Sequence, residues 1–279
     1  MRRVVHLSDL HFGRADPVVV DALLSTIRRL APHLAVVSGD LTQRARRTEF
    51  REARAFLDAL PCPCLVVPGN HDVPLYDLGR RFLNPLGRFR HFITPDLRPV
   101  HRDEEYVAIG LNTTRAWTVK DGTIRLGDLE HALTALQEAG LQRVKLVVAH
   151  HPFETRGGSW ARMMGRAPVP QALMALSRAG ADVFLTGHLH VGYTGHTAAR
   201  YRMAARTAIV VEGGTATSTR MRGEANSFSL ICIERRRISV ERWVWQPAAE
   251  RFVTEHGAQH FDASPSGWLP VDDRFPPRA

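Results

Sequence analysis

The chain contains a series of short apolar segments, rich in β-branched residues, that alternate with segments of helical periodicity. Predicted buried strands cover residues 4–8, 34–38, 65–67, 106–111, 144–149 and 183–186. Predicted helices begin near Pro17, Thr48 and Asp128 and cover residues 171–178. Strands that alternate with helices in this way predict a parallel sheet with right-handed crossovers. We therefore expect an α/β fold.

The pattern changes near the end of the chain, where helical periodicity disappears. Predicted strands there cover residues 208–212, 228–234 and 238–245. The last segment, 246–279, is rich in Pro, Asp and aromatic residues and has no clear period. We expect one domain over residues 1–245 and a C-terminal tail, residues 246–279, packed on its surface.

A polar motif follows each of five predicted strands directly. These motifs are Asp9-x-His11, Gly39-Asp40, Gly69-Asn70-His71-Asp72, His150-His151-Pro152 and Gly187-His188-x-His190. Loops at the carboxyl ends of strands line the ligand crevice of an open α/β sheet. The motifs can therefore meet at one place although they are far apart in sequence.

The residue types in these motifs suit metal ions. Mn²⁺, Fe and Zn²⁺ accept carboxylate, imidazole and amide-oxygen ligands. A single carboxylate after a glycine, Asp40, could bridge two such ions. Each motif alone is ordinary, since Gly-Asp is common turn chemistry and Asp-x-His pairs are frequent on loops. The ordered set, each member after a strand, predicts a dinuclear metal site.

With these motifs, residues 4–234 resemble the calcineurin-like metallophosphoesterases. Within that superfamily, Gly39-Asp40-Leu41-Thr42 and the segment 214–219 look most like the bacterial class III cyclic nucleotide phosphodiesterases. The resemblance implies a four-layer α/β/β/α sandwich with two mixed sheets. It also implies a hydrolase that acts on small phosphodiesters, cyclic nucleotides among them, through a hydroxide held between two metal ions.

The same resemblance implies a ligand set. One metal would take Asp9, His11, Asp40 and His190, and the other would take Asp40, Asn70, His150 and His188. His150 is preferred to His151 because the family places its ligand two residues before the proline. His71 is the candidate donor of a proton or hydrogen bond to the phosphate or leaving oxygen, with Asp72 as the residue that orients it.

Three alternatives stay open at this point. The metal motifs indicate phosphoryl chemistry and not the attached group, so a nuclease or phosphomonoesterase fits as well. The segments 74–99 and 156–170 should control access, because bulky loops would exclude a polymer. A non-catalytic scaffold is a second alternative, although the ligand set is intact. A lipid-pyrophosphate hydrolase would need an amphipathic surface, which the phenylalanines of residues 82–92 suggest only faintly.

The composition limits which binding partners and which cellular location we expect. The net charge is +9, but Lys occurs only at positions 120 and 145, so the basic excess is nearly all arginine. This skew is typical of codon bias, so a nucleic-acid partner is compatible with the charge and not required by it. Three cysteines do not make a disulfide framework, and no apolar run is long enough to span a bilayer. We expect a cytoplasmic protein and leave its oligomeric state open, a homodimer included.

Overall fold

The computed structural model describes residues 1–117, 122–153, 169–200, 206–219 and 223–271. Its larger sheet has eight strands, in the order β14-β13-β11-β10-β1-β2-β3, with β12 paired to β11. These strands are β1 (Arg2–Leu7), β2 (Leu34–Val37), β3 (Cys64–Val66), β10 (Ser227–Ile233), β11 (Arg237–Gln246), β12 (Arg251–Thr254), β13 (Gln259–Ser264) and β14 (Gly267–Pro270). Strands β1, β2 and β3 are parallel, and the others pair antiparallel.

The smaller sheet has six strands in the order β4-β5-β6-β7-β9-β8. They are β4 (Val100–Arg102), β5 (Tyr106–Leu111), β6 (Val144–Ala149), β7 (Val183–His190), β8 (Tyr193–His196) and β9 (Ile209–Gly214). The four central strands are parallel, and the two edge strands run antiparallel to them. The expected α/β fold with two mixed sheets is confirmed.

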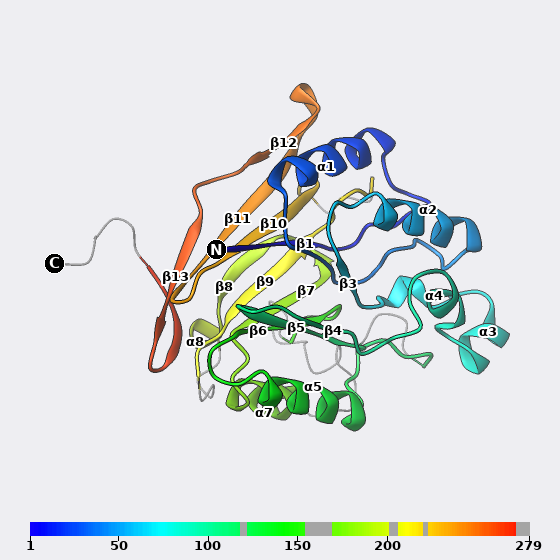
Figure 1. Ribbon diagram of the computed structural model, residues 1–279. Helices are drawn as coiled ribbons and strands as arrows, with labels where there is room; N and C mark the ends of the chain where they lie inside the picture. Colours follow the sequence, from blue (N-terminus) through cyan, green and yellow to red (C-terminus); the bar gives the residue numbers. More distant parts are fainter. Residues whose placement is uncertain (118–121, 154–168, 201–205, 220–222, 272–279) are drawn as a thin grey trace.

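The two sheets stack face to face, and helices cover both outer faces (Figure 1). Helices α1 (Pro17–Leu30) and α2 (Arg47–Asp58) cover the larger sheet, whereas α5 (Leu126–Glu138) and α7 (Val169–Arg178) cover the smaller one. The shorter helices are η1 (Asn70–Asp72), α3 (Leu78–Leu83), α4 (Gly87–Phe92), α8 (Thr197–Arg200) and η2 (Pro247–Ala249). Among the described residues, no helix combines the length and the apolar character that crossing a membrane requires.

The core forms three apolar layers because the central strands are buried on both faces. In β1, Val4 points toward the other sheet, and its neighbour Val5 points toward α1 and α2. Successive side chains of a strand point to opposite faces, so an uninterrupted apolar run is what a doubly covered strand requires. A third layer lies between the smaller sheet and helices α5 and α7.

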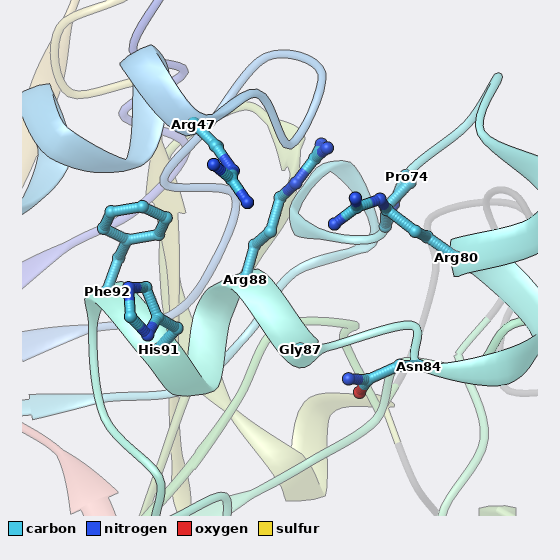
Figure 2. A pocket seen from close by; sticks show the side chains of 8 residues that line it. All are labelled: Arg47, Pro74, Arg80, Asn84, Gly87, Arg88, His91 and Phe92. Carbon is cyan, nitrogen blue, oxygen red and sulfur yellow. The ribbon is translucent and has the colours of Figure 1, made fainter.

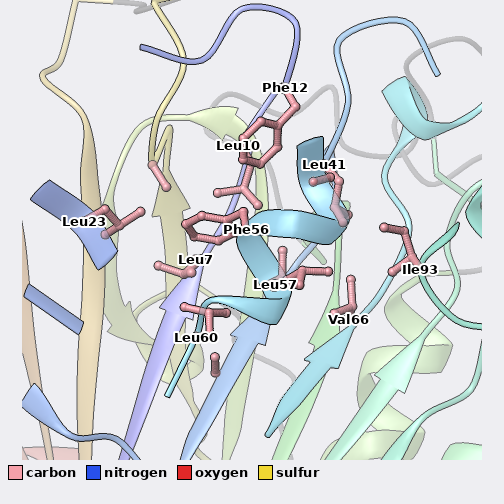
Figure 3. Packing of buried hydrophobic residues seen from close by; sticks show 14 of the residues in the cluster. Leu7, Leu10, Phe12, Leu23, Leu41, Phe56, Leu57, Leu60, Val66 and Ile93 are labelled. Atoms are coloured by element: carbon pink, nitrogen blue, oxygen red, sulfur yellow. The ribbon is translucent and has the colours of Figure 1, made fainter. Parts of the chain in front are cut away.

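Apolar residues also anchor the loops that leave β1 and β2. Leu10, Phe12 and Leu41 are almost completely buried and pack near Phe56 and Leu57 of α2 (Figure 3). Each of them alternates with a polar residue of the predicted site. Burial of these side chains therefore fixes the position of the polar residues beside them.

Most of residues 251–270, within the expected C-terminal tail, have regular secondary structure. This segment forms β12, β13 and β14, which extend the larger sheet. Phe261 and Trp268 are buried between the two sheets, and the Trp268 indole donates a 2.8 Å hydrogen bond to the Asp182 carboxylate. The strands are short and end in polar turns, so their sequence carries little periodicity. The domain boundary at residue 245 stays a prediction.

Candidate metal centre

The seven residues predicted as metal ligands come together at the carboxyl ends of strands from both sheets. Asp9 and Asp40 follow β1 and β2 of the larger sheet, and His150 follows β6 of the smaller sheet. Asn70 lies in η1, whereas the pair His188 and His190 lies within the irregular end of β7 and not in a loop. Among the described residues, the Asp and His side chains form two clusters with metal-ligand spacing.

Backbone hydrogen bonds hold the first two loops side by side. The Asp9 amide donates to the Gly39 carbonyl at 3.1 Å, and the His11 amide donates to the Asp40 carbonyl at 2.9 Å. The loops from β1 and β2 thus continue the register of the parallel strands beyond their ends. Asp9, His11 and Asp40 are brought together by this pairing and not by chance proximity.

Five of the predicted ligands have left-handed backbone conformations. Their φ values are 53° for Asp9, 50° for His11, 54° for Asp40, 76° for His188 and 60° for His190. A positive φ is uncommon for residues other than glycine and costs about 1–3 kcal/mol, and such strain concentrates at functional sites. The fold therefore holds these five residues in a strained backbone conformation at the place where their side chains converge.

The first cluster consists of Asp9, His11, Asp40 and His190. Asp9 Oδ1 lies 3.1 Å from His190 Nε2 and 3.5 Å from His11 Nε2, and the two Nε2 atoms are 3.3 Å apart. Ligand atoms about 2.0–2.2 Å from a shared ion lie roughly 3.0–3.5 Å from one another. The spacing of these three atoms fits that requirement.

Asp9 gives a second indication of a cation. Its Oδ2 accepts hydrogen bonds from Ser8 Oγ at 2.6 Å and from the His188 amide at 3.0 Å. Its Oδ1 is buried and receives no hydrogen bond. A buried carboxylate oxygen without a donor is costly unless a cation faces it.

The second cluster surrounds the Asn70 side chain. Asn70 Oδ1 lies 3.1 Å from His150 Nε2 and 3.0 Å from His188 Nδ1. The other ring nitrogen of His150 is 2.8 Å from the Ser38 carbonyl, which fixes the ring so that Nε2 points inward. His151 also borders this cluster, with its Nδ1 2.8 Å from Thr113 Oγ1. His150 is favoured over His151 as the ligand because its Nε2 lies 3.1 Å from Asn70 Oδ1 and 3.3 Å from Asp40 Oδ1.

Asp40 lies between the two clusters. Its Oδ1 is 3.3 Å from His150 Nε2, and its Oδ2 is 3.8 Å from His11 Nε2. Each oxygen of one buried carboxylate therefore faces a different cluster. The His71 amide donates to Oδ1 at 2.8 Å and restrains the group in this orientation.

Gly69 is required for the close approach of the η1 loop to Asp40. A Cβ at residue 69 would overlap Asp40 Oδ1 and the Asp40 backbone nitrogen. No side chain other than hydrogen fits there without displacing the carboxylate. The glycine before Asn70 is thus part of the site's geometry.

The electrostatics of the site suit a cation. Burial opposes ionisation of Asp9 and Asp40, but the surrounding histidines outweigh it and hold the pKa of both carboxyls well below the usual range. Burial lowers the pKa of His188 to about 4, which keeps that ring neutral. Burial also opposes protonation of His150, but the Asp40 charge raises its pKa to about 9. Ionised carboxylates and neutral imidazoles are the forms that bind metals, so a cation would replace the His150 proton.

The Asp72 carboxylate accepts hydrogen bonds from the neighbouring loops, and its expected role in orienting His71 stays a prediction. Its Oδ1 accepts from the amide and hydroxyl of Thr42, both at 2.9 Å, and its Oδ2 accepts from the amides of Leu41 at 3.2 Å and Gly69 at 2.9 Å. Burial and the Asp40 charge raise the Asp72 pKa to about 6, against the effect of these hydrogen bonds. The carboxylate therefore ties the Asp40 loop to the Asn70 loop.

Gln43 and His11 both contact the His71 ring. His71 Nδ1 lies 2.9 Å from the Gln43 carbonyl, and the His71 ring packs edge-on against His11 with the centroids 4.8 Å apart. Gln43 and Ser38 were not singled out from the sequence. Both act through backbone carbonyls, which leave no signal in the residue type.

The two clusters form a candidate dinuclear metal site within an α/β fold of two stacked sheets. The model of the calcineurin-like phosphoesterases matches residues 2–192, so the chain belongs to this family.

Two curated proteins are similar to this chain over part of its length. A probable cyclic nucleotide phosphodiesterase from Synechococcus sp. is 24% identical over 174 residues, which cover 62% of this chain and 63% of that protein. A glycerophosphodiester phosphodiesterase, GpdQ, from Enterobacter lignolyticus is 37% identical over 84 residues, 25% of this chain and 29% of that protein. The chain thus spans less than two thirds of either relative.

Two solved structures share the fold at low sequence identity. The purple acid phosphatase PPD1 of yellow lupin superposes with a TM-score of 0.69 at 13% identity, covering 93% of this chain and 53% of that chain. A dimetal phosphatase from Danio rerio superposes with a TM-score of 0.62 at 14% identity, covering 91% of this chain and 98% of that chain. These similarities support the fold assignment alone.

Proposed function

We propose that the protein is a phosphodiesterase that hydrolyses small phosphodiesters at a dinuclear metal site. The observation that carries the proposal is the position of Asp40, whose two oxygens face two separate ligand clusters 3.3 Å and 3.8 Å away. A carboxylate in this position could be shared by two cations, and a metal pair would supply the Lewis-acid chemistry that phosphoryl transfer uses.

The proposed ligands divide into two sets that share Asp40. One metal takes Asp9, His11, Asp40 and His190, and the other takes Asp40, Asn70, His150 and His188. Nitrogen and oxygen donors without a thiolate favour Mn, Fe or Zn. When bound, the metal pair activates water and stabilises the negative charge that develops on the phosphate.

His71 has a separate proposed role, which is to hold a proton for the phosphate or leaving oxygen. If Nδ1 carries a proton toward the Gln43 carbonyl, Nε2 can donate only when the ring is the imidazolium. The His71 amide donates to the Asp40 carboxylate, which holds the residue beside the candidate ligands. A positioned imidazolium suits a general acid or hydrogen-bond donor, which is the role proposed for His71.

The diester preference rests on the two curated relatives, whose names describe phosphodiesterases. The cyclic-nucleotide substrate class has the same support and no more. The loop expected over residues 156–170 as a control of access lies outside the described residues up to position 168. A small diester is thus proposed from similarity, whereas the metal chemistry is proposed from geometry.

The test is a substrate screen on the metal-reconstituted full chain. Bis(p-nitrophenyl) phosphate, 2′,3′- and 3′,5′-cyclic nucleotides, linear dinucleotides, single-stranded DNA and phosphomonoesters are compared by kcat/KM after loading with Mn²⁺, Fe²⁺ or Zn²⁺. We expect small diesters to be hydrolysed best and the Asp40→Asn variant to be inactive on all of them. A preference for monoesters or for DNA would overturn the small-diester proposal. Complete inactivity of the reconstituted protein would favour the scaffold reading.

A further inference from the structure

A cavity of about 240 Å³ lies between the start of α2 and helices α3 and α4. Arg47, Arg80, Arg88 and His91 line it, and we call these four residues the arginine pocket. The guanidinium groups of Arg47 and Arg80 extend from opposite sides toward the side chain of Arg88 (Figure 2). Three segments that are separate in sequence thus direct positive charge into one small space.

The nearby acids do not balance this charge. Asp77 Oδ2 is 2.9 Å from Arg80 Nε and 3.9 Å from Arg88 Nη2, so one carboxylate serves two guanidinium groups. The Glu49 carboxylate accepts hydrogen bonds from the backbone amides of Arg44 and Arg46. Its Oε2 therefore already has two donors on the backbone before α2. No ion pair joins the Arg47 guanidinium to any described acid. The pocket therefore has a local excess of positive charge.

Arg88 is the most constrained member of the group. Its side chain is only 21% exposed, and its Nη1 donates to the Ala45 carbonyl at 2.7 Å. Its Nε is buried and has no hydrogen-bond partner. Burial lowers the pKa of Arg88 and the charge of Arg80 lowers it further, against the opposing effect of Asp77. An uncompensated guanidinium donor in such surroundings costs stability unless an anion accepts from it.

The pocket borders the segments that carry the proposed proton donor. Ala45, which holds Arg88, lies two residues after Gln43, whose carbonyl contacts the His71 ring. Pro74, another lining residue, lies two residues after Asp72. A ligand in the pocket would therefore contact the same loops that shape one side of the metal centre.

We propose that the arginine pocket is a second, metal-independent binding site for a phosphate group. Guanidinium groups match the geometry and charge of phosphate oxygens, and several of them around one space favour a dianion. The phosphate has two sources with the same chemistry. It is either a second phosphate of the substrate, which rests on the proposed diesterase function, or a phosphate carried by a separate molecule.

The first experiment separates substrate from non-substrate phosphate. A thymidine dinucleotide with a 5′-terminal phosphate is compared with the same dinucleotide without it, using the reconstituted full chain. The test variant is the double substitution Arg47→Gln, Arg80→Gln, which spares the buried Arg88. The control is Arg236→Gln, Arg251→Gln, which removes the same charge from exposed positions outside the pocket.

If the pocket binds the terminal phosphate of the substrate, the test variant loses kcat/KM for the phosphorylated dinucleotide by roughly 10- to 100-fold. That range corresponds to loss of one or two charge-assisted contacts. The unphosphorylated dinucleotide and the control variant should keep their values. This pattern would assign the pocket to the substrate.

The second experiment does not depend on activity. Thermal unfolding of wild type and both variants is followed with inorganic phosphate as the probe, at constant ionic strength. Phosphate at the metal centre stabilises all three proteins alike, so a smaller stabilisation of the test variant alone measures the pocket. If phosphate stabilises the test variant less but its kcat/KM for the phosphorylated dinucleotide is unchanged, the pocket binds a separate phosphate-bearing molecule. Equal stabilisation of all three proteins, together with unchanged dinucleotide kinetics, would overturn the proposal even if the diesterase function holds.

Discussion

Replacement of Asp72 by alanine separates a structural role from a catalytic one. The Asp72 carboxylate joins the Asp40 loop to the Asn70 loop through four hydrogen bonds, three of them from backbone amides. All of these groups are buried, since Asp72, Leu41 and Thr42 are 0% exposed and Gly69 is buried too. The Asp72→Ala variant leaves the three amides without their acceptor.

The expected loss of stability follows from these contacts. A buried donor without a partner costs about 1–3 kcal/mol. Water reaches some of the vacated space, and removal of a carboxylate whose pKa is raised to about 6 recovers part of the cost. The lower end of the range for three amides is therefore appropriate, so the free energy of unfolding should fall by about 3 kcal/mol.

Urea unfolding at neutral pH measures this change directly. A matched control is Asp262→Ala, which removes an exposed carboxylate paired with Arg237 and should cost less than about 1 kcal/mol. The Asp72→Ala variant should also bind metal more weakly, because both loops carry proposed ligands. An unchanged stability combined with a large loss of kcat would refute this reasoning and support a catalytic role for Asp72.

Three further perturbations test other parts of the site. Gly69→Ala should displace the Asp40 carboxylate and reduce the metal content of the protein. The control is Gly257→Ala, where an added Cβ meets nothing within 4 Å, and its metal content should be unchanged. Equal metal content in both variants would contradict the close approach of Gly69 to Asp40. Burial lowers the pKa of His6 to about 4, so the neutral ring stabilises the fold fully above about pH 6.5 and less as the pH falls toward 4. Urea unfolding should show about 2 kcal/mol lost from this group at pH 5, and a His6→Gln variant with the same pH dependence as wild type would disprove the assignment. His71→Ala should keep its metals and lose about 10²- to 10⁴-fold in kcat for bis(p-nitrophenyl) phosphate, so hydrolysis at the parent rate would exclude His71 as the donor.

The sequence predicted the central strands because both of their faces are buried. Segments such as 34–37 need an uninterrupted apolar run, and such runs are visible in a single sequence. The edge strands β4 and β8 are short and partly exposed, so they lack this signal. Strands β12 to β14 were missed for the same reason, although Phe261 and Trp268 complete the core between the sheets.

The candidate ligands were predictable because each stands next to the end of a strand. What the sequence could not indicate is the direction of each side chain. Asp72 adjoins His71 in sequence, yet its carboxylate points to the backbone of the Asp40 loop. The arginine pocket could not be predicted from the sequence either. Nothing in the sequence distinguishes Arg47, Arg80 and Arg88 from the other arginines, and only the fold brings them together.

The most direct test of the central claim is the metal content of the reconstituted chain and of its Asp40→Asn variant, measured by elemental analysis. Asp40 faces both clusters, so wild type should hold two metal ions per chain and the variant should lose both together. The His71→Ala variant serves as the control and should retain two. A wild-type chain with a single ion, or an Asp40→Asn variant that loses only one, would contradict the bridging role and with it the dinuclear site.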